Sequence, residues 1–285
     1  MALNIATFKT RALTAVLFVA VMLAGLLINN WTLLVLFIII HFGCWYEFHK
    51  LMGNIDPRYK EVNSNQKLAG SLIGLGFILW NTQLMSLGSL PLRKFGYSIM
   101  LIGLAYFVIT VLLEPKYKNG LIKYTFLSLL YISLSWGLLI NLSNWSIEGY
   151  PAIVLTLIAS IWLNDTLAYL VGSFIGKTPF SKISPKKTWE GTAGGAILAV
   201  ALITLVGRWL ISPSLTHMFL AVSIIAAIFG TLGDLLESKI KRMAGVKDSG
   251  SIMPGHGGFL DRFDSLLIAT LVVWVYIYIG MHFMK

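Results

Sequence analysis

Long apolar segments constrain this chain more than any other feature of its sequence. Nine stretches are long enough to cross a hydrocarbon core about 30 Å thick, since a spanning helix needs roughly 20 residues. They cover residues 11–28, 31–48, 68–88, 95–113, 126–143, 151–172, 194–211, 217–236 and 259–280. In lipid each must be a helix, because its backbone groups find no water to bond. The sequence therefore predicts an all-α polytopic membrane protein with about nine transmembrane helices.

The charged residues predict the topology of these helices. Only 12% of the residues are charged, yet the net charge is +10. When the connections are numbered alternately, most lysines and arginines fall on one side, which the positive-inside rule makes cytoplasmic. The N-terminus is then cytoplasmic and the C-terminus outside. The basic excess is thus a topology signal, and we expect no binding of nucleic acid.

Residues in and next to the first two spans bear on targeting and on metals. The first span follows Lys9 and lacks a small-residue cleavage site, so we expect an uncleaved anchor. The single cysteine, Cys44, has no partner for an intrachain disulfide. We expect His41 and His49 to be packing or interfacial residues rather than metal ligands.

Acidic residues divide the chain into two parts. The five before residue 150, including Glu47, are expected in loops or at span ends where water reaches them. Four later ones fall inside apolar spans or at their edges, namely Asp165, Asp234, Asp261 and Asp264. Charged groups at membrane depth are costly and are therefore functional candidates. We predict a scaffold over residues 1–150 and a catalytic region over 151–285, with cytoplasmic loops 173–193 and 237–258.

Three of these carboxylates are candidate metal ligands. The eighth and ninth spans run in opposite directions, so Asp234 lies at a depth similar to that of Asp261 and Asp264. The last two are three residues apart and share a helix face. Carboxylates at one level suit Mg²⁺, which completes its shell with water and phosphate oxygens. The alternative is a structural ion network with Arg262, Lys241 or Arg242.

Polar residues next to these acids favour an anionic ligand. Asp234, Ser238, Lys241 and Arg242 form one stripe if the eighth helix continues beyond the membrane, although a solvated helix end with a Glu237–Lys241 pair has the same pattern. The glycine-rich run 254–258 then leads into the ninth helix, where free N–H groups attract anions. It can equally be a tight turn, in which His256 either donates to a phosphate or caps the turn.

A second polar block, residues 184–191, lies in the other cytoplasmic loop. Lys186 and Lys187 suit phosphate binding and Thr188 adds a donor, although ordinary cytoplasmic lysines are the alternative. Asn164 and Asp165 either line a polar cavity or hydrogen-bond across helices. Two small-residue motifs, Gly70-x-x-x-Gly74 and Gly191-x-x-x-Gly195, allow close helix packing or a homodimer.

The polar positions of both blocks resemble a known family signature. The run is Ser238-x-x-Lys241-Arg242-x-x-x-x-Lys247-Asp248, then Pro254-Gly-His-Gly-Gly258-x-x-Asp261-Arg262-x-Asp264-Ser265. It closely resembles the signature of CDP-diacylglycerol synthases, also called phosphatidate cytidylyltransferases. Residues 184–191 look like a second block of that family. The front half agrees only in having several hydrophobic spans.

The resemblance implies a reaction in which phosphatidate and CTP give CDP-diacylglycerol and pyrophosphate within a bacterial cytoplasmic membrane. It also implies a divalent cation, Mg²⁺, and leaves open whether a monovalent cation assists. Carried onto matching positions, Asp234, Asp261 and Asp264 become the metal ligands. The catalytic candidates are Asp261, Asp264, Lys241, Arg242 and His256. The substrate-binding candidates are Ser184, Lys186, Lys187, Thr188, Glu190, Ser238, Lys247, Asp248, Gly257, Gly258 and Arg262.

Two other functions are compatible with parts of this pattern. An ion-coupled transporter of an anionic solute also places acids within a membrane, although transporters commonly show internal repeats. Another CDP-lipid transferase, one that joins an alcohol to CDP-diacylglycerol, also favours aspartates at a membrane face. A CTP requirement and the release of pyrophosphate separate the synthase from the second alternative.

Overall fold

The computed structural model describes residues 5–83, 85–113, 118–146, 150–252 and 257–283. Most of them are helical. Up to residue 143 the chain forms α1 (Ile5–Leu27), α2 (Asn30–Ile55), α3 (Pro57–Lys60), α4 (Ser64–Trp80), the hairpin β1 (Ser86–Leu87) and β2 (Leu90–Pro91), α5 (Leu92–Leu113), α6 (Lys118–Ser128), η2 (Leu129–Ser133) and α7 (Leu134–Ser143). It continues with α8 (Ala152–Ile175), α9 (Trp189–Leu210), η3 (Pro213–Leu215), α10 (Thr216–Met243) and α11 (Leu260–Phe283).

Within the described residues, seven helical stretches are long and apolar enough to cross a membrane. They are α2, α5, the continuous segment from α6 to α7, α8, α9, α10 with its preceding turn, and α11. Of the other two predicted spans, 11–28 coincides with α1, whereas 68–88 overlaps α4 only in part. Helix α4 ends at Trp80 and Ser86–Leu87 form β1, so the predicted helix was too long at its C-terminal end. The described apolar stretch of each is shorter than a typical spanning helix, since α4 has 17 residues and that of α1 covers Thr14–Leu27. The all-α polytopic fold class is therefore confirmed, whereas the count of nine crossings stays a prediction.

The chain forms two compact units. The first comprises Met1–Asn144 and Ile240–Phe263, and the second comprises Trp145–Lys239 and Asp264–Lys285. Residues 240–263 thus group with the N-terminal part of the chain rather than with the rest of the C-terminal half. The assignment of scaffold and catalytic roles to residues 1–150 and 151–285 stays a prediction.

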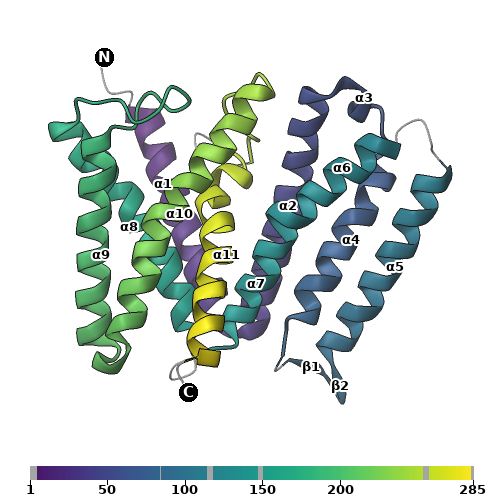
Figure 1. The fold of residues 1–285 in the computed structure, drawn as a ribbon, viewed down its shortest axis with the longest axis horizontal. Coiled ribbons are helices and arrows are strands. Elements are labelled where there is room, and N and C mark those ends of the chain that lie inside the picture. The colour runs from purple at the N-terminus through teal and green to yellow at the C-terminus, as the bar shows by residue number, and fades with distance from the viewer. Residues whose placement is uncertain (1–4, 84, 114–117, 147–149, 253–256, 284–285) are drawn as a thin grey trace. The chain divides into compact units, whose positions relative to one another are not determined.

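In the first unit, α4 and α5 lie side by side, and α4 also packs on α2 and on the α6–α7 segment (Figure 1). Close packing depends on small residues of α4. A side chain at Gly70 would collide with Trp45, and one at Gly74 would collide with Ser133. Trp45 Nε1 donates to Ser133 Oγ at 2.8 Å, which ties α2 to the π-helical turn η2.

In the second unit, α8 and α9 lie side by side (Figure 1). A side chain at Gly191 or Gly195 of α9 would collide with the backbone of α8 at Ala168. The two small-residue motifs found in the sequence therefore serve close packing within the chain. The homodimer that they also permit stays a prediction.

Candidate active site

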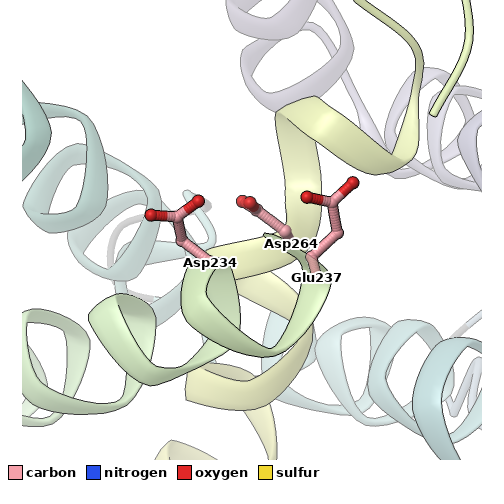
Figure 2. A group of neighbouring side chains, drawn as sticks. All are labelled: Asp234, Glu237 and Asp264. Carbon is pink, nitrogen blue, oxygen red and sulfur yellow. The ribbon is translucent and has the colours of Figure 1, made fainter. Parts of the chain in front are cut away.

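Three carboxylates gather on two helices of the second unit. Asp234 and Glu237 come from α10 and Asp264 comes from α11. Each offers an oxygen within 4.8 Å of the others, and Figure 2 shows the three side chains extending to the same side of the two helices. Glu237 is fully buried and Asp264 is 8% exposed. We refer to Asp234, Glu237 and Asp264 as the acidic triad.

The geometry of the triad follows from its spacing and from a close helix crossing. Asp234 and Glu237 are three residues apart, so they share a face of α10. Gly233 precedes Asp234, and a side chain there would meet the backbone carbonyl of Asp264. The lack of a side chain at Gly233 thus allows the two helices to approach closely enough for the carboxylates to meet.

One lysine lies against the triad. Lys187, in the connection between α8 and α9, forms an ion pair with Asp234. Burial by itself lowers the pKa of Lys187, but attraction to Asp234, and then to Asp165 and Asp264, outweighs burial and raises the pKa above its usual value. Lys187 is therefore charged at neutral pH, and it lies within electrostatic range of three carboxylates.

The donor set fits a hard divalent cation. The carboxylates of the triad offer oxygens within 4.8 Å of one another, and Lys187 is attracted to Asp234, Asp165 and Asp264. Like charges this close repel strongly unless a cation separates them. Mg²⁺ prefers carboxylate oxygens and binds through one or two of them while keeping water and phosphate ligands. The carboxylates of the triad can thus hold a divalent cation.

The loop that carries Lys187 is fixed by the start of α9. Glu190 accepts hydrogen bonds from the backbone N–H groups of Lys177 and Thr178 and from the Thr178 hydroxyl. Thr188 is the N-cap of α9, and its hydroxyl accepts from Gly191 N at 3.2 Å. Both side chains hold the loop backbone in place, which positions Lys187 opposite Asp234.

Asp261 has a different environment, within the first unit. Its Oδ1 accepts a hydrogen bond from Lys241 Nζ at 2.6 Å in a nearly buried ion pair. Its Oδ2 accepts from Ser249 N at 2.8 Å, from Ser249 Oγ at 2.9 Å and from Gly258 N at 2.7 Å. Among the described residues, Asp261 does not belong to the group that can share one ion.

Glu47 contributes to the same part of the first unit, where the sequence analysis expected a water-exposed acid. It is 4% exposed, so that expectation is wrong. Its carboxylate accepts from Ser249 Oγ at 2.7 Å, Phe259 N at 3.0 Å and Leu260 N at 2.8 Å. A carboxylate at the first N–H groups of α11 satisfies donors that have no partner within the helix. Glu47 thereby caps α11 from a segment more than 200 residues away in sequence.

The glycines of the 250–258 segment make room for these two carboxylates. A side chain at Gly250 or Gly258 would collide with the Glu47 carboxylate, and one at Gly257 would collide with Asp261. Gly257 also has φ +84°, a conformation that favours glycine. The glycines therefore allow the Glu47 and Asp261 carboxylates of the protein itself to approach the backbone closely.

The remaining predicted residues fall into three groups. Lys186, Arg242, Lys247, Asp248 and Arg262 are exposed, and Arg242 donates to the carbonyl of Val246 at the end of α10. Ser238 is buried beside Asp234, and its hydroxyl lies 3.5 Å from Asp234 Oδ1. Ser184 forms a turn in which its backbone carbonyl accepts a hydrogen bond from Lys187 N. His256 lies outside the described residues.

Comparison with known proteins decides the family. A family model described as the cytidylyltransferase family matches residues 9–280. The chain belongs to the cytidylyltransferase family. The match covers almost all of the chain, including the front half, in which the sequence analysis found only hydrophobic spans. The resemblance inferred from the two polar blocks is therefore confirmed.

Several named members of this family are similar to the chain. A Bacillus subtilis protein named phosphatidate cytidylyltransferase is 39% identical over 159 residues, or 55% of this chain and 59% of the relative. One of that name from Staphylococcus haemolyticus is 50% identical over 109 residues, or 38% and 42%. Phosphatidate cytidylyltransferase 4, chloroplastic, from Arabidopsis thaliana is 40% identical over 149 residues, or 51% and 37%. The chain thus spans about half the length of the curated relatives that it matches.

Two acids that the structure places among the candidate site residues, Glu237 and Glu47, were not predicted from the sequence. Glu237 was noted only as a partner for Lys241, although its spacing of three from Asp234 already placed both on one face of α10. Glu47 carried no comparable local signal. The only hint was that Glu47 is an acidic residue near the end of the apolar run 31–48.

Proposed function

We propose that this protein is a phosphatidate cytidylyltransferase. Phosphatidate and CTP react to give CDP-diacylglycerol and pyrophosphate. A lipid phosphate oxygen forms a bond with the α-phosphorus of CTP, and the bond between the α-phosphorus and its bridging oxygen breaks as pyrophosphate leaves. The nucleophile is supplied by the lipid, so the reaction needs no covalent enzyme intermediate.

The acidic triad with Lys187 is the observation that carries this proposal. A transfer between two anions depends on positioning and on charge stabilisation rather than on covalent chemistry by the protein. Membership of the cytidylyltransferase family and the names of the similar proteins support a cytidylyl transfer to phosphatidate. The apolar helices support a lipid substrate.

In this proposal Asp234, Glu237 and Asp264 hold Mg²⁺. When bound, Mg²⁺ neutralises phosphate charge and so reduces the repulsion between the nucleophile and CTP. Lys187, charged and fixed against Asp234, binds a phosphate oxygen beside the triad. Ser238 lies within reach of Asp234 and orients its carboxylate.

The residues of the first unit have a positioning role. Asp261 fixes Lys241 through the ion pair, and Lys241 contributes positive charge toward a phosphate. Glu47 and Asp261 hold Ser249 and the backbone of Gly258 to Leu260 in place, and the exposed Lys247 and Arg262 on either side contact substrate. Arg242 adds positive charge next to Lys241 in the first unit, and Lys186 adds it next to Lys187 in the second.

The proposal includes the topology expected from the sequence. The chain crosses a bacterial cytoplasmic membrane nine times, with its N-terminus inside, so that both polar loops face the cytoplasm. CTP then arrives from the cytoplasm, while phosphatidate enters from the inner leaflet. The distribution of lysine and arginine over the connections supports this orientation.

The decisive assay uses the purified chain in detergent, with CTP labelled at the α-phosphate and with phosphatidate. We expect label in the lipid fraction and an equal amount of pyrophosphate, only when Mg²⁺ is present. Asp264→Asn should abolish both products while the protein still elutes as a monodisperse species. Lipid labelling without a membrane gradient argues against a transporter. Failure to release pyrophosphate from CTP would refute the proposed reaction.

A further inference from the structure

A cavity lies in the first unit, against α2 and α4. Its volume is about 440 Å³. The walls come from one face of α2 and one face of α4, with Lys60 of α3 at the end of the cavity. None of the acids described for the candidate active site lines this cavity. Its lining residues belong entirely to the segment from Phe42 to Ser71.

The α2 wall changes from apolar to cationic along the helix. Phe42, Trp45 and Tyr46 are followed at helical spacing by His49 and Lys50. At 1.5 Å per residue, this face extends on the order of 12 Å along α2. It runs toward the connection that the charge distribution predicts to be cytoplasmic. The wall therefore has the polarity of a membrane boundary, with acyl chains at one end and headgroups at the other.

The opposite wall repeats this change of polarity. Helix α4 runs back from the same connection, and it contributes Ser64 and Lys67 before Leu68. Together with Lys50 and Lys60, Lys67 gives the cationic end three lysines. None of the described residues that line the cavity is acidic. The lysines at this end therefore favour an anion.

His49 adds a buried donor to the cavity. It lines the cavity and is only 7% exposed, and its Nε2 has no hydrogen-bond partner among the described residues. The other ring nitrogen, Nδ1, hydrogen-bonds to the Tyr59 hydroxyl. Burial, and then the neighbouring Tyr124, raise the pKa of Tyr59 above its usual value, so the hydroxyl keeps its proton. We therefore assign Tyr59 as the donor to Nδ1 and place the ring proton on Nε2.

A buried N–H group without a partner is costly, and an anionic oxygen in the cavity would satisfy it. We propose that this cavity binds one anionic glycerophospholipid from the bilayer. The phosphate lies among Lys50, Lys60 and Lys67, with His49 Nε2 donating to a phosphate or ester oxygen. The acyl chain lies along Phe42, Trp45 and Leu68. The lipid is bound and not converted, so this site is independent of the cytidylyl transfer.

Native mass spectrometry of the full chain in detergent tests this site. Phosphatidylglycerol and phosphatidylcholine with the same acyl chains are offered at equal concentration. We expect one phosphatidylglycerol to be retained at least ten times more tightly than phosphatidylcholine. Each lysine near a membrane surface contributes about 1 kcal/mol toward an anionic lipid, so the triple change Lys50→Gln/Lys60→Gln/Lys67→Gln should weaken retention about 100-fold.

Matched variants separate this site from general charge effects and from misfolding. The exposed cations Arg93, Lys94 and Lys123 lie outside the cavity, and replacing all three by glutamine should leave retention unchanged. Leu68→Glu changes a side chain that is 45% exposed, so the fold should tolerate it while the added charge repels the lipid phosphate. Asp264→Asn should retain the lipid, because the acidic triad has no part in this site.

Three results would overturn the proposal. Equal retention of the two lipids would remove the anionic selectivity. An equal loss in the control triple variant would assign the effect to overall charge. Displacement of the lipid by millimolar inorganic phosphate or glycerol 3-phosphate would show that the cavity takes a soluble phosphate instead.

Discussion

Substitution of Glu47 by glutamine tests whether this buried acid of α2 holds the start of α11 in place. The change keeps the size and shape of the side chain but replaces one carboxylate oxygen by an NH₂ group. Both oxygens accept from backbone N–H groups, Oε1 from Phe259 and Oε2 from Leu260. Whichever way the amide turns, a donor therefore faces a donor at the start of α11.

The hydrogen bonds involved set the size of the effect. A hydrogen bond to a charged group contributes roughly 1.5–3 kcal/mol, and a neutral one about 1 kcal/mol. Glu47→Gln loses one charged bond at a buried position and reduces the remaining ones to neutral strength. We expect the local opening free energy of this segment to fall by about 2–4 kcal/mol. Since each 1.4 kcal/mol is a factor of ten, opening becomes roughly 30 to 1,000 times more frequent.

Hydrogen–deuterium exchange on the full chain measures this opening directly. The amides of Phe259 and Leu260 exchange through local opening, so their exchange rate should rise by the same factor in Glu47→Gln. The matched control is Asp56→Asn, another acid-to-amide change in the first unit. Asp56 caps α3 by accepting from Arg58 N, and asparagine caps a helix equally well. The control should leave exchange at residues 257–263 unchanged.

An unchanged exchange rate at Phe259 and Leu260 in a folded Glu47→Gln protein would refute the capping role. A uniform rise across all helices would also count against it, because the effect would then be global rather than local. The proposed cytidylyl transfer should fall in Glu47→Gln mainly through a higher KM for CTP.

Three further predictions concern other parts of the structure. Asp261→Asn leaves the buried ammonium of Lys241 without its carboxylate and should cost about 3–5 kcal/mol of stability in chemical unfolding, whereas replacing both partners by apolar residues should cost less. The pKa of Lys187 is raised in the folded protein, so the ion pair with Asp234 stabilises the fold at all pH values below the unfolded pKa of Lys187. This stabilisation is lost as the pH rises through the higher folded pKa. The difference in Tm between wild type and Lys187→Gln should therefore be constant from pH 6 to about pH 9 and shrink in more alkaline buffers. Gly195→Leu forces a side chain into the backbone of α8 and should destabilise by at least about 1–3 kcal/mol in denaturant titrations, whereas Gly280→Leu, which enters open space, should be close to neutral.

The sequence predicted the parts of this protein that depend on local patterns. Apolar length fixes the helices, because lipid leaves the backbone no alternative. The two polar blocks lie close enough together in sequence for a family signature to be recognised. The pairing of Asp234 with Asp264 also followed, since adjacent antiparallel spans bring the end of one to the start of the next.

Other contacts depend on packing that the sequence does not encode locally. Spacing placed Asp261 and Asp264 on a similar face of α11, yet Asp261 accepts from Lys241, Ser249 and Gly258 instead of joining the triad. The role of Glu47 required knowing that α2 lies against the start of α11. The resulting carboxylate cap also explains Gly258, for which the sequence left open an anion site or a tight turn, and Gly250, which no sequence pattern singled out.

Binding of Mn²⁺ to the purified chain, followed by electron paramagnetic resonance, tests the central claim most directly. Mn²⁺ takes the same oxygen ligands as Mg²⁺, and its free and bound signals differ. The structure predicts that Glu237→Gln loses tight binding, as Asp264→Asn does, and that Asp261→Asn retains it. Retention in Glu237→Gln together with loss in a folded Asp261→Asn protein would contradict this assignment and restore Asp234, Asp261 and Asp264 as the ligand set.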